Sequence, residues 1–299
     1  MDTRFWGPSG WKLLHMISFT YQYSPESSVL YSKFLETIPF ILPCKYCRSS
    51  LIDYYKEHPF QISTGKYTNQ NERAFLNGTG VMNPMLDLTK WMFTIHNCVN
   101  NKLRTQGLYS APNPTFSEVK TKYTALCKEP WNVQLAQLWD FLFAVGYNHP
   151  RDTHHDSIPM PDCPPGIRRS KDKCERNKWN VLSLKDKIVW YNRFWTFLPA
   201  VLPSEIAIRW QEAIAQYPVT LQSRQSTLAW LWRIRCMLDT DFKDPYTSIC
   251  KKVASYSSDC GASKNGITCR KGHSRKGHSH TRHSRSKRSK TRKTISHRK

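Results

Sequence analysis

Two cysteines separated by two residues, Cys44 and Cys47, have the type and spacing best suited to chemistry in this sequence. Pro43 precedes them and favours the start of a helix, which places the two sulfurs one turn apart and within reach of a disulfide. The helix dipole and the unpaired N–H groups at a helix N-terminus stabilise a thiolate. The motif is therefore poised for thiol–disulfide exchange, although zinc knuckles, thioredoxin-like sites and chance produce the same spacing.

Two histidines stand at helical spacing from other chemically useful side chains. His96 and Asn100 lie one turn apart on a predicted helix, and Trp11 and His15 lie one turn apart on another. Taken separately, the first pair also fits an ordinary helix with a solvated polar face. The second pair also fits an aromatic core around one hydrogen-bonded histidine.

The elements that would position these residues are predicted to be helices, because strand alternation is not evident and the class is all-α. Ser9 is the predicted N-cap of the first helix, Pro39 is predicted to stop the second, and Gly146 the sixth. Residues 60–82 are predicted as a long loop and residues 149–182 as a linker. The predicted helices cover residues 11–17, 28–38, 43–57, 84–103, 116–126, 131–145, 184–198, 204–217, 226–239 and 245–257.

An internal repeat relates the two halves of this helical part. Residues 34–44 align without gaps with residues 194–204. The blocks that begin at Trp11 and Trp91 correspond to those that begin at Trp139 and Trp230. The offsets between copies differ, so loops of different length must intervene, and chance agreement of proline-flanked helices is the alternative. Where the first copy has Cys44, Cys47, His15, His96 and Asn97, the second has Ser204, Ala207, Phe143, Arg235 and Cys236.

Composition divides the chain into a folded body and a basic tail. The 299 residues are 39% apolar and 13% aromatic, which is too aromatic for a wholly disordered protein. The net charge is +23, and residues 264–299 carry 14 Lys or Arg and no acid. We expect a first domain at 1–128, a second helical domain at 129–262 that is a degenerate, non-catalytic copy, and a disordered tail at 263–299.

The sequence shows neither a membrane span nor a secretory signal. No apolar run approaches the roughly 18 residues that a span needs, and the start lacks the pattern of a signal peptide. Such a chain is expected among reduced thiols, so its ten cysteines point to metal binding or redox work.

Together the three blocks resemble the Erv/ALR family of FAD-dependent sulfhydryl oxidases, most closely those of large DNA viruses. The resemblance covers about residues 4–125 and rests on the order of the blocks as well as their residues. The blocks are Trp11-Lys-Leu-Leu-His15, Pro43-Cys44-Lys-Tyr-Cys47 and Trp91 followed by His96-Asn97-Cys-Val99-Asn100. One departure is that the structural cysteine pair that often follows the His-Asn helix is missing, with only Cys127 nearby.

The resemblance implies a four-helix bundle with a short fifth helix that holds FAD, with Cys44 and Cys47 as the catalytic pair against its isoalloxazine ring. It implies that Cys44 is the exposed sulfur met by substrate and that Cys47 lies next to the flavin. No metal is expected. The residues implied to line the FAD site are Trp6, Gly7, Trp11, His15, His96, Asn97, Val99, Asn100 and Lys102.

The activity implied is disulfide formation in protein dithiols, with molecular oxygen as acceptor and hydrogen peroxide as product. The alternative is a redox-inactive helical scaffold or nucleic-acid-binding structural protein in which Cys44–Cys47 is a structural disulfide or half a metal site. A yellow protein with a flavin absorption band would separate the two. The resemblance places the protein in the host cytoplasm and the virion, or alternatively in the mitochondrial intermembrane space.

The remaining expectations concern other cysteines and partners. A second, shuttle pair could come from Cys163 and Cys174 or from the cluster Cys250, Cys260 and Cys269, with structural disulfides or free thiols as the alternative. Cys98 and Cys236 are expected to be small apolar residues facing helix interiors. The tail could bind nucleic acid nonspecifically, or be a solvated or nuclear-localising segment. No membrane partner is expected, and the assembly is a homodimer or an intrachain pseudo-dimer.

Overall fold

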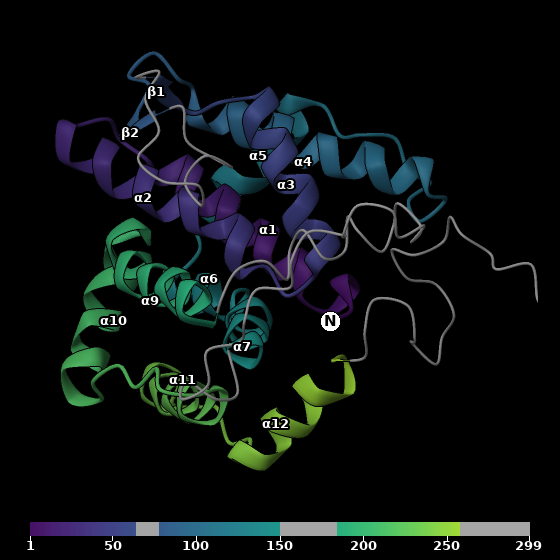
Figure 1. Ribbon diagram of the computed structural model, residues 1–299. Helices are drawn as coiled ribbons and strands as arrows, with labels where there is room; N and C mark the ends of the chain where they lie inside the picture. The colour runs from purple at the N-terminus through teal and green to yellow at the C-terminus, as the bar shows by residue number, and fades with distance from the viewer. Residues whose placement is uncertain (64–77, 150–183, 258–299) are drawn as a thin grey trace, which may run out of the picture.

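The computed structural model describes residues 1–63, 78–149 and 184–257, and these ranges are mostly helical (Figure 1). The predicted all-α class is confirmed: eleven helices and one pair of short strands make up the secondary structure of the described ranges. None of these helices has a stretch long and apolar enough to cross a membrane. Nearly all of the predicted linker, and all of the basic tail, lie outside the described residues.

The first half of the chain supplies five helices. Helices α1 and α4 contact each other, α3 contacts both α2 and α4, and α5 lies against α1 and α4. This is the expected four-helix arrangement with a short fifth helix. The bounds are α1 (Thr3–Thr20), α2 (Pro25–Ile41), α3 (Lys45–Glu57), α4 (Leu88–Thr105) and α5 (Phe116–Leu126).

A strand pair lies in the region predicted to be only loop. Strand β1 (Gln61–Ser63) pairs antiparallel with β2 (Gly78–Met82). The Met82 N–H donates to the Ser28 hydroxyl over 3.1 Å, which ties the strand pair to α2. Both strands are too short to show alternation of apolar and polar residues, so the sequence pattern did not reveal them.

Three of the predicted helix boundaries are wrong because proline lies inside the helix; one is the end of the helix that begins at Leu184, which continues past Pro199 to Val201. Helix α1 starts at Thr3, where the Asp2 carboxylate accepts the Arg4 N–H over 2.9 Å, and Pro8 sits within it. Helix α2 continues past Pro39 to its last residue, Ile41. A proline removes one backbone hydrogen bond, and burial of most of the surrounding apolar side chains offsets that loss.

Ser9, predicted as an N-cap, instead joins the two halves of the chain. Its hydroxyl donates to the Gln137 carbonyl over 2.7 Å and accepts the Phe141 N–H over 3.2 Å. Next to it, a Cβ on Gly10 would lie 3.0 Å from the Phe141 ring, so α1 approaches the second half closely at this point. The predicted single helix over residues 131–145 breaks at this same contact.

The second half supplies six described helices. The break at Gln137 and Leu138 separates α6 from α7, and Gly146 lies inside α7 instead of stopping it. A Cβ on Gly146 would come within 2.7 Å of Leu231, so this glycine allows two helices to touch. The bounds are α6 (Trp131–Ala136), α7 (Trp139–Asn148), α9 (Leu184–Val201), α10 (Ser204–Gln216), α11 (Arg224–Leu238) and α12 (Tyr246–Ser255).

The two halves share one hydrophobic core. Helix α2 packs along α9, and α1 packs against α7, which in turn contacts α11 (Figure 1). Phe40 stacks on Trp190 with ring centroids 3.9 Å apart, and the Tyr31 hydroxyl donates to the Val201 carbonyl over 3.4 Å. Low residue numbers of α2 thus meet high numbers of α9, so the two helices run antiparallel.

The helix contacts of the second half follow those of the first. Helix α1 contacts α4, as α7 contacts α11; α2 contacts α3, as α9 contacts α10; and α3 contacts α4, as α10 contacts α11. Helix α5 lies on α1 and α4, as α12 lies on α7 and α11. Apart from α6, which contacts α10, the same helix order therefore occurs with the same packing partners in both halves.

Candidate functional site

The cysteine pair lies at the start of α3. Cys44 is the N-cap residue, with extended backbone angles, and Cys47 is the third residue of the helix. Both cysteines therefore lie at the positive end of the helix dipole, although the Cys44 side chain does not cap the helix with a hydrogen bond.

The two cysteines are buried to different extents, and the order is the opposite of the one expected from the sequence. Cys44 is 1% exposed and belongs to the core, whereas Cys47 is half-buried. The chain before Cys44 is held inward, because the Pro43 carbonyl accepts from the Met1 nitrogen over 3.3 Å. The Arg48 guanidinium also donates to the Leu42 carbonyl over 2.5 Å. Cys47 is therefore the sulfur that retains accessible surface.

Four aromatic and imidazole rings meet where α1, α4 and α5 touch. His15 Nε2 lies 3.0 Å from His96 Nδ1, which is a hydrogen bond between the two rings. Trp11 stacks on His96 with centroids 3.8 Å apart, and Tyr123 stacks on His15 at 4.2 Å. The structure thus brings together three of the predicted site residues, and it adds Tyr123, which the sequence analysis did not identify. Tyr123 and Val119 form the buried face of α5, and that spacing could have indicated it.

The histidine pair is uncharged near neutral pH. Burial, together with the neighbouring His96 and Lys122, lowers the pKa of His15 to about 2. Burial lowers the pKa of His96 to about 4, with Lys122 as the second cause. With both rings neutral, a single hydrogen lies between them. His15 Nδ1 is buried and has no hydrogen-bond partner among the described residues.

The other predicted site residues of α4 extend from this cluster toward α3. Asn100 is buried, and its amide donates to the Asn97 side-chain oxygen over 3.4 Å. Lys102 donates to the Ser50 hydroxyl, which links α4 to the helix that carries the cysteines. Val99 is half-buried.

The predicted site residues at the start of α1 lie apart from the ring cluster. The Trp6 ring is 6.0 Å from that of Phe141 on α7, so Trp6 faces the second half. Its indole N–H is buried without a hydrogen-bond partner among the described residues. Gly7 has open space where a Cβ would be.

The surroundings of the remaining cysteines differ in part from those expected from the sequence. Cys98 and Cys236 are half-buried, and the Cys98 sulfur lies 3.8 Å from His58 Nε2, so Cys98 has a polar neighbour. Burial raises the pKa of both thiols. Cys250 is half-buried on α12. Cys163, Cys174, Cys260 and Cys269 lie outside the described residues. Within the described ranges, no group of three or more His, Cys, Asp or Glu is arranged to hold a metal ion.

At the equivalent place in the second half, a cation replaces the histidine pair. The Arg235 guanidinium lies 3.9 Å from the Phe242 ring centroid, 5.4 Å from Trp139 and 6.0 Å from Phe143. Trp210, which aligns with Ser50, is fully buried and stacks on Trp139 with centroids 5.9 Å apart. Large side chains of the second half therefore fill the region that corresponds to the ring cluster.

Comparison with known proteins shows what the first half is similar to. A match to the Erv1 / Alr family covers residues 8–123, which contain both the cysteine pair and the ring cluster. Residues 8–123 are thus similar to the Erv1 / Alr family. The predicted resemblance to large-virus members is confirmed by the relatives described next.

The relatives of the Erv1 / Alr segment come from large DNA viruses. A protein of Acanthamoeba polyphaga mimivirus, named "Probable FAD-linked sulfhydryl oxidase R368", is 28% identical over 102 residues, 33% of this chain and 59% of its own length. The FAD-linked sulfhydryl oxidase of African swine fever virus is 26% identical over 120 residues, 40% of this chain and 79% of its own. A protein of Invertebrate iridescent virus 6, also named as an FAD-linked sulfhydryl oxidase, is 34% identical over 58 residues, 19% of this chain and 52% of its own.

The alignments leave part of this chain and part of each relative unmatched. The chain spans little more than half the length of the mimivirus and iridescent virus proteins. The family match ends at residue 123, so the second half is not included in it. No solved structure matches the chain.

Proposed function

We propose that the chain is an FAD-dependent thiol oxidase that forms disulfides in protein substrates, with oxygen as acceptor and hydrogen peroxide as product. The observation that carries the proposal is the ring cluster of Trp11, His15 and His96 in the same bundle as a cysteine pair at a helix N-terminus. The names of the viral relatives support the same activity.

The residues of the first half suit FAD. Stacked indole, imidazole and phenol rings offer flat faces for the isoalloxazine and adenine rings. His15 Nδ1, within the ring cluster, is a buried polar atom without a partner among the described residues, as expected of a group that hydrogen-bonds to a ligand. Asn97, Asn100 and Lys102 would add polar contacts, and Gly7 and Val99 would complete the lining.

The cysteine pair would exchange its disulfide with substrate thiols. A substrate thiolate attacks the more accessible Cys47 sulfur, the Cys44–Cys47 bond breaks, and Cys44 leaves as a thiolate next to the first amides of α3. A second substrate thiolate then breaks the mixed disulfide, so the substrate leaves oxidised, and both cysteines are reduced. Bound FAD supplies the two-electron acceptor that restores the Cys44–Cys47 disulfide and passes the electrons to oxygen.

The second half, residues 129–262, would be a degenerate copy that holds no flavin. Its matching helix contacts support a duplication, and Arg235, Phe143 and Trp210 occupy the space equivalent to the ring cluster. A cationic guanidinium and two bulky rings leave no room for a second isoalloxazine. The first domain would then be residues 1–128, and the pair of halves an intrachain pseudo-dimer.

The viral origin of the relatives favours action on viral proteins in the host cytoplasm and in the virion. A disulfide-forming enzyme is useful there because the cytosol keeps thiols reduced.

Three measurements on the purified full-length protein test the proposal. We expect a flavin absorption band, oxygen consumption with dithiothreitol, and one hydrogen peroxide formed for each disulfide. A colourless protein that does not consume oxygen after incubation with FAD would favour the alternative, a redox-inactive scaffold with a structural Cys44–Cys47 pair. Peroxide formation without disulfide formation would also contradict it.

A further inference from the structure

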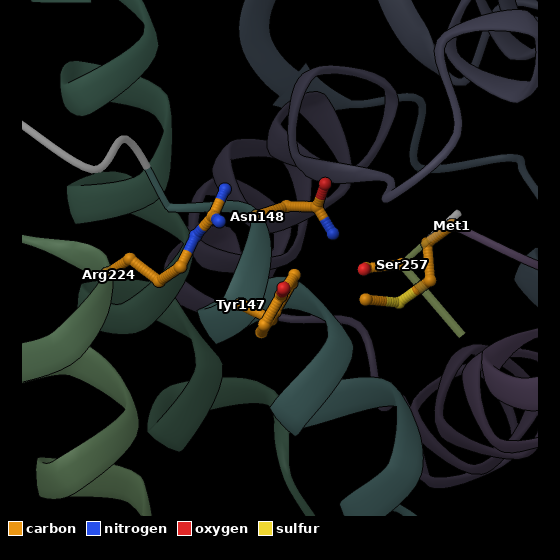
Figure 2. A pocket seen from close by; sticks show the side chains of 5 residues that line it. All are labelled: Met1, Tyr147, Asn148, Arg224 and Ser257. Carbon is orange, nitrogen blue, oxygen red and sulfur yellow. The ribbon is translucent and has the colours of Figure 1, made fainter. Parts of the chain in front are cut away.

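The residues that follow α12 are joined to the start of the chain by two contacts. The Tyr256 carbonyl accepts the Asp2 N–H over 2.9 Å, and the Tyr256 ring stacks on Phe5 with centroids 4.4 Å apart and planes 3° from parallel. Met1 and Ser257 line the same cavity of about 190 Å³, and Figure 2 shows their side chains close together. The first residues of the chain therefore lie against the end of α12.

Helix α12 is itself fixed to the second half of the chain. Ile249 and Val253 on α12 are buried, and the helix packs on α7 and α11. The Lys252 ammonium forms an ion pair with Asp140 of α7 over 2.8 Å and lies 5.5 Å from the centroid of the Phe5 ring. The start of the chain is therefore held by an element that belongs to the second half.

The start of the chain in turn holds the loop that precedes Cys44. Met1 is buried, and its nitrogen donates to the Pro43 carbonyl over 3.3 Å. Asp2 also caps α1, because its carboxylate accepts the Arg4 N–H over 2.9 Å. The Met1 Cα and the Asp2 N–H belong to one rigid peptide plane, so only one free torsion separates that N–H from the Met1 nitrogen. Fixing the Asp2 N–H on α12 therefore also restrains the donor that binds Pro43.

The Pro43 carbonyl is the group through which this restraint reaches the cysteine pair. The carbonyl shares a peptide plane with the N–H of Cys44, so holding the carbonyl orients the backbone of Cys44, whose side chain is 1% exposed. The preceding carbonyl, that of Leu42, is held from within α3 by the Arg48 guanidinium. The loop before the cysteines is thus held by one local contact and by one contact that depends on the second half.

We propose that Tyr256 and Phe5 are positioning residues for the cysteine pair, and that through them the second half keeps Cys44 buried and leaves Cys47 to meet substrate. The inference rests on the proposed oxidase function and assigns to the flavin-free half a role at the same site. Each catalytic cycle must re-form the Cys44–Cys47 disulfide, which requires the two Cβ atoms to come within about 4 Å. Releasing the loop should therefore expose Cys44 to external reagents and slow the closure of the disulfide.

The burial of Cys44 is tested by alkylation of the FAD-loaded full chain that carries Cys47→Ser, in which Cys44 cannot form the pair disulfide. Labelling of each cysteine by iodoacetamide is followed over time by peptide mass spectrometry. Tyr256→Ala should raise the rate at Cys44 severalfold, up to about tenfold, because the loss of one stacked aromatic pair permits local opening of this size. Tyr256→Phe keeps the ring and should restore the slow rate. Tyr23→Ala, which removes an exposed tyrosine elsewhere, should leave the rate slow.

Two other cysteines serve as internal references in the same samples. Cys98 on α4 and Cys127 at the end of α5 are half-buried, and their labelling rates should not change in Tyr256→Ala. An unchanged rate at Cys44 would overturn the proposal. An equal rise at all three cysteines would also overturn it, because it would show a general loss of structure and not the release of one loop.

Turnover of the chain with both cysteines present separates this inference from the oxidase function. Wild type and the Tyr256 variants are compared for oxygen consumption with dithiothreitol and for FAD content. Tyr256→Ala should lower kcat severalfold at unchanged FAD content, and Tyr256→Phe should restore kcat. A wild-type protein that consumes no oxygen would contradict the oxidase function, whereas the alkylation rates would still decide whether the second half holds Cys44. A normal kcat in Tyr256→Ala would contradict the positioning role alone.

Discussion

Phe34 and Phe194, which occupy aligned positions in the two repeated segments, contact each other with ring centroids 5.5 Å apart. On either side, Phe40 meets Trp190 and Lys33 lies over the Phe197 ring. Equivalent residues meet at the middle of an interface only when the two copies are related by a two-fold axis. The contact therefore supports an intrachain pseudo-dimer centred near these two phenylalanines.

Truncating one ring of this pair should destabilise both halves together. Phe194 is fully buried, so we expect Phe194→Ala to lower the free energy of unfolding by about 3–5 kcal/mol. Denaturant unfolding followed by both tryptophan and flavin fluorescence should show one coincident transition at lower denaturant. Tyr23→Ala, at a ring that is 54% exposed, is the control and should change little. A shift of the tryptophan signal alone would mean that the halves unfold independently.

The assembly prediction follows from the same interface. Because α9 covers α2 within one chain, the full-length protein should be a monomer by light scattering at micromolar concentration. A dimer mass that persists on dilution would show that another face mediates association.

Substitutions at aligned positions in the two halves should have different effects on the FAD content of the purified protein. His96→Ala removes a ring from the stack with Trp11, so this variant should purify with little FAD. Arg235→Ala, the aligned change, should keep the wild-type ratio of one FAD per chain, measured by absorbance after denaturation. Two FAD per wild-type chain, or full FAD in the His96 variant, would refute the assignment of the pocket.

Replacing Cys44 and replacing Cys47 by serine should have different effects. Cys47→Ser should abolish oxygen consumption with dithiothreitol while FAD stays bound, because other residues form the pocket. Cys44→Ser should also be inactive, but its half-buried Cys47 should attack an added aromatic disulfide reagent, release one thiolate and keep the other half as a mixed disulfide, seen by mass spectrometry. Cys236→Ser is the matched control with normal turnover. Trapping only through Cys44 in the Cys47→Ser protein would show that Cys44, not Cys47, meets substrate.

Stability should fall in mild acid because of the histidine pair. The pKa values of His15 and His96 are lowered by folding, so the unfolded chain binds more protons below about pH 6.5. The free energy of unfolding should decrease as pH falls from 6.5 toward 4, by at most about 1.4 kcal/mol per pH unit for each histidine. Urea unfolding of wild type and His96→Gln at pH 7, 6 and 5 checks this, and the variant should show the smaller dependence. Identical slopes would mean that His96 titrates normally in the folded protein.

Local sequence determined the helical class, most helix positions and the residue types of the candidate site. Helix periodicity and capping act over a few residues, so α5 at Phe116–Leu126 and the start of α3 after Pro43 could be predicted directly. The order of the cysteine, histidine and asparagine blocks was likewise sufficient to indicate the family.

Tertiary structure decided what local rules could not. Pro8 and Pro39 lie inside helices because burial of the surrounding side chains outweighs a missing hydrogen bond, which the sequence alone does not show. The burial of Cys44, the stacking of Tyr123 on His15 and the place of Arg235 over aromatic rings all depend on helices distant in the chain. Burial also sets the pKa of each histidine, because desolvation acts on the folded environment and not on the residue type.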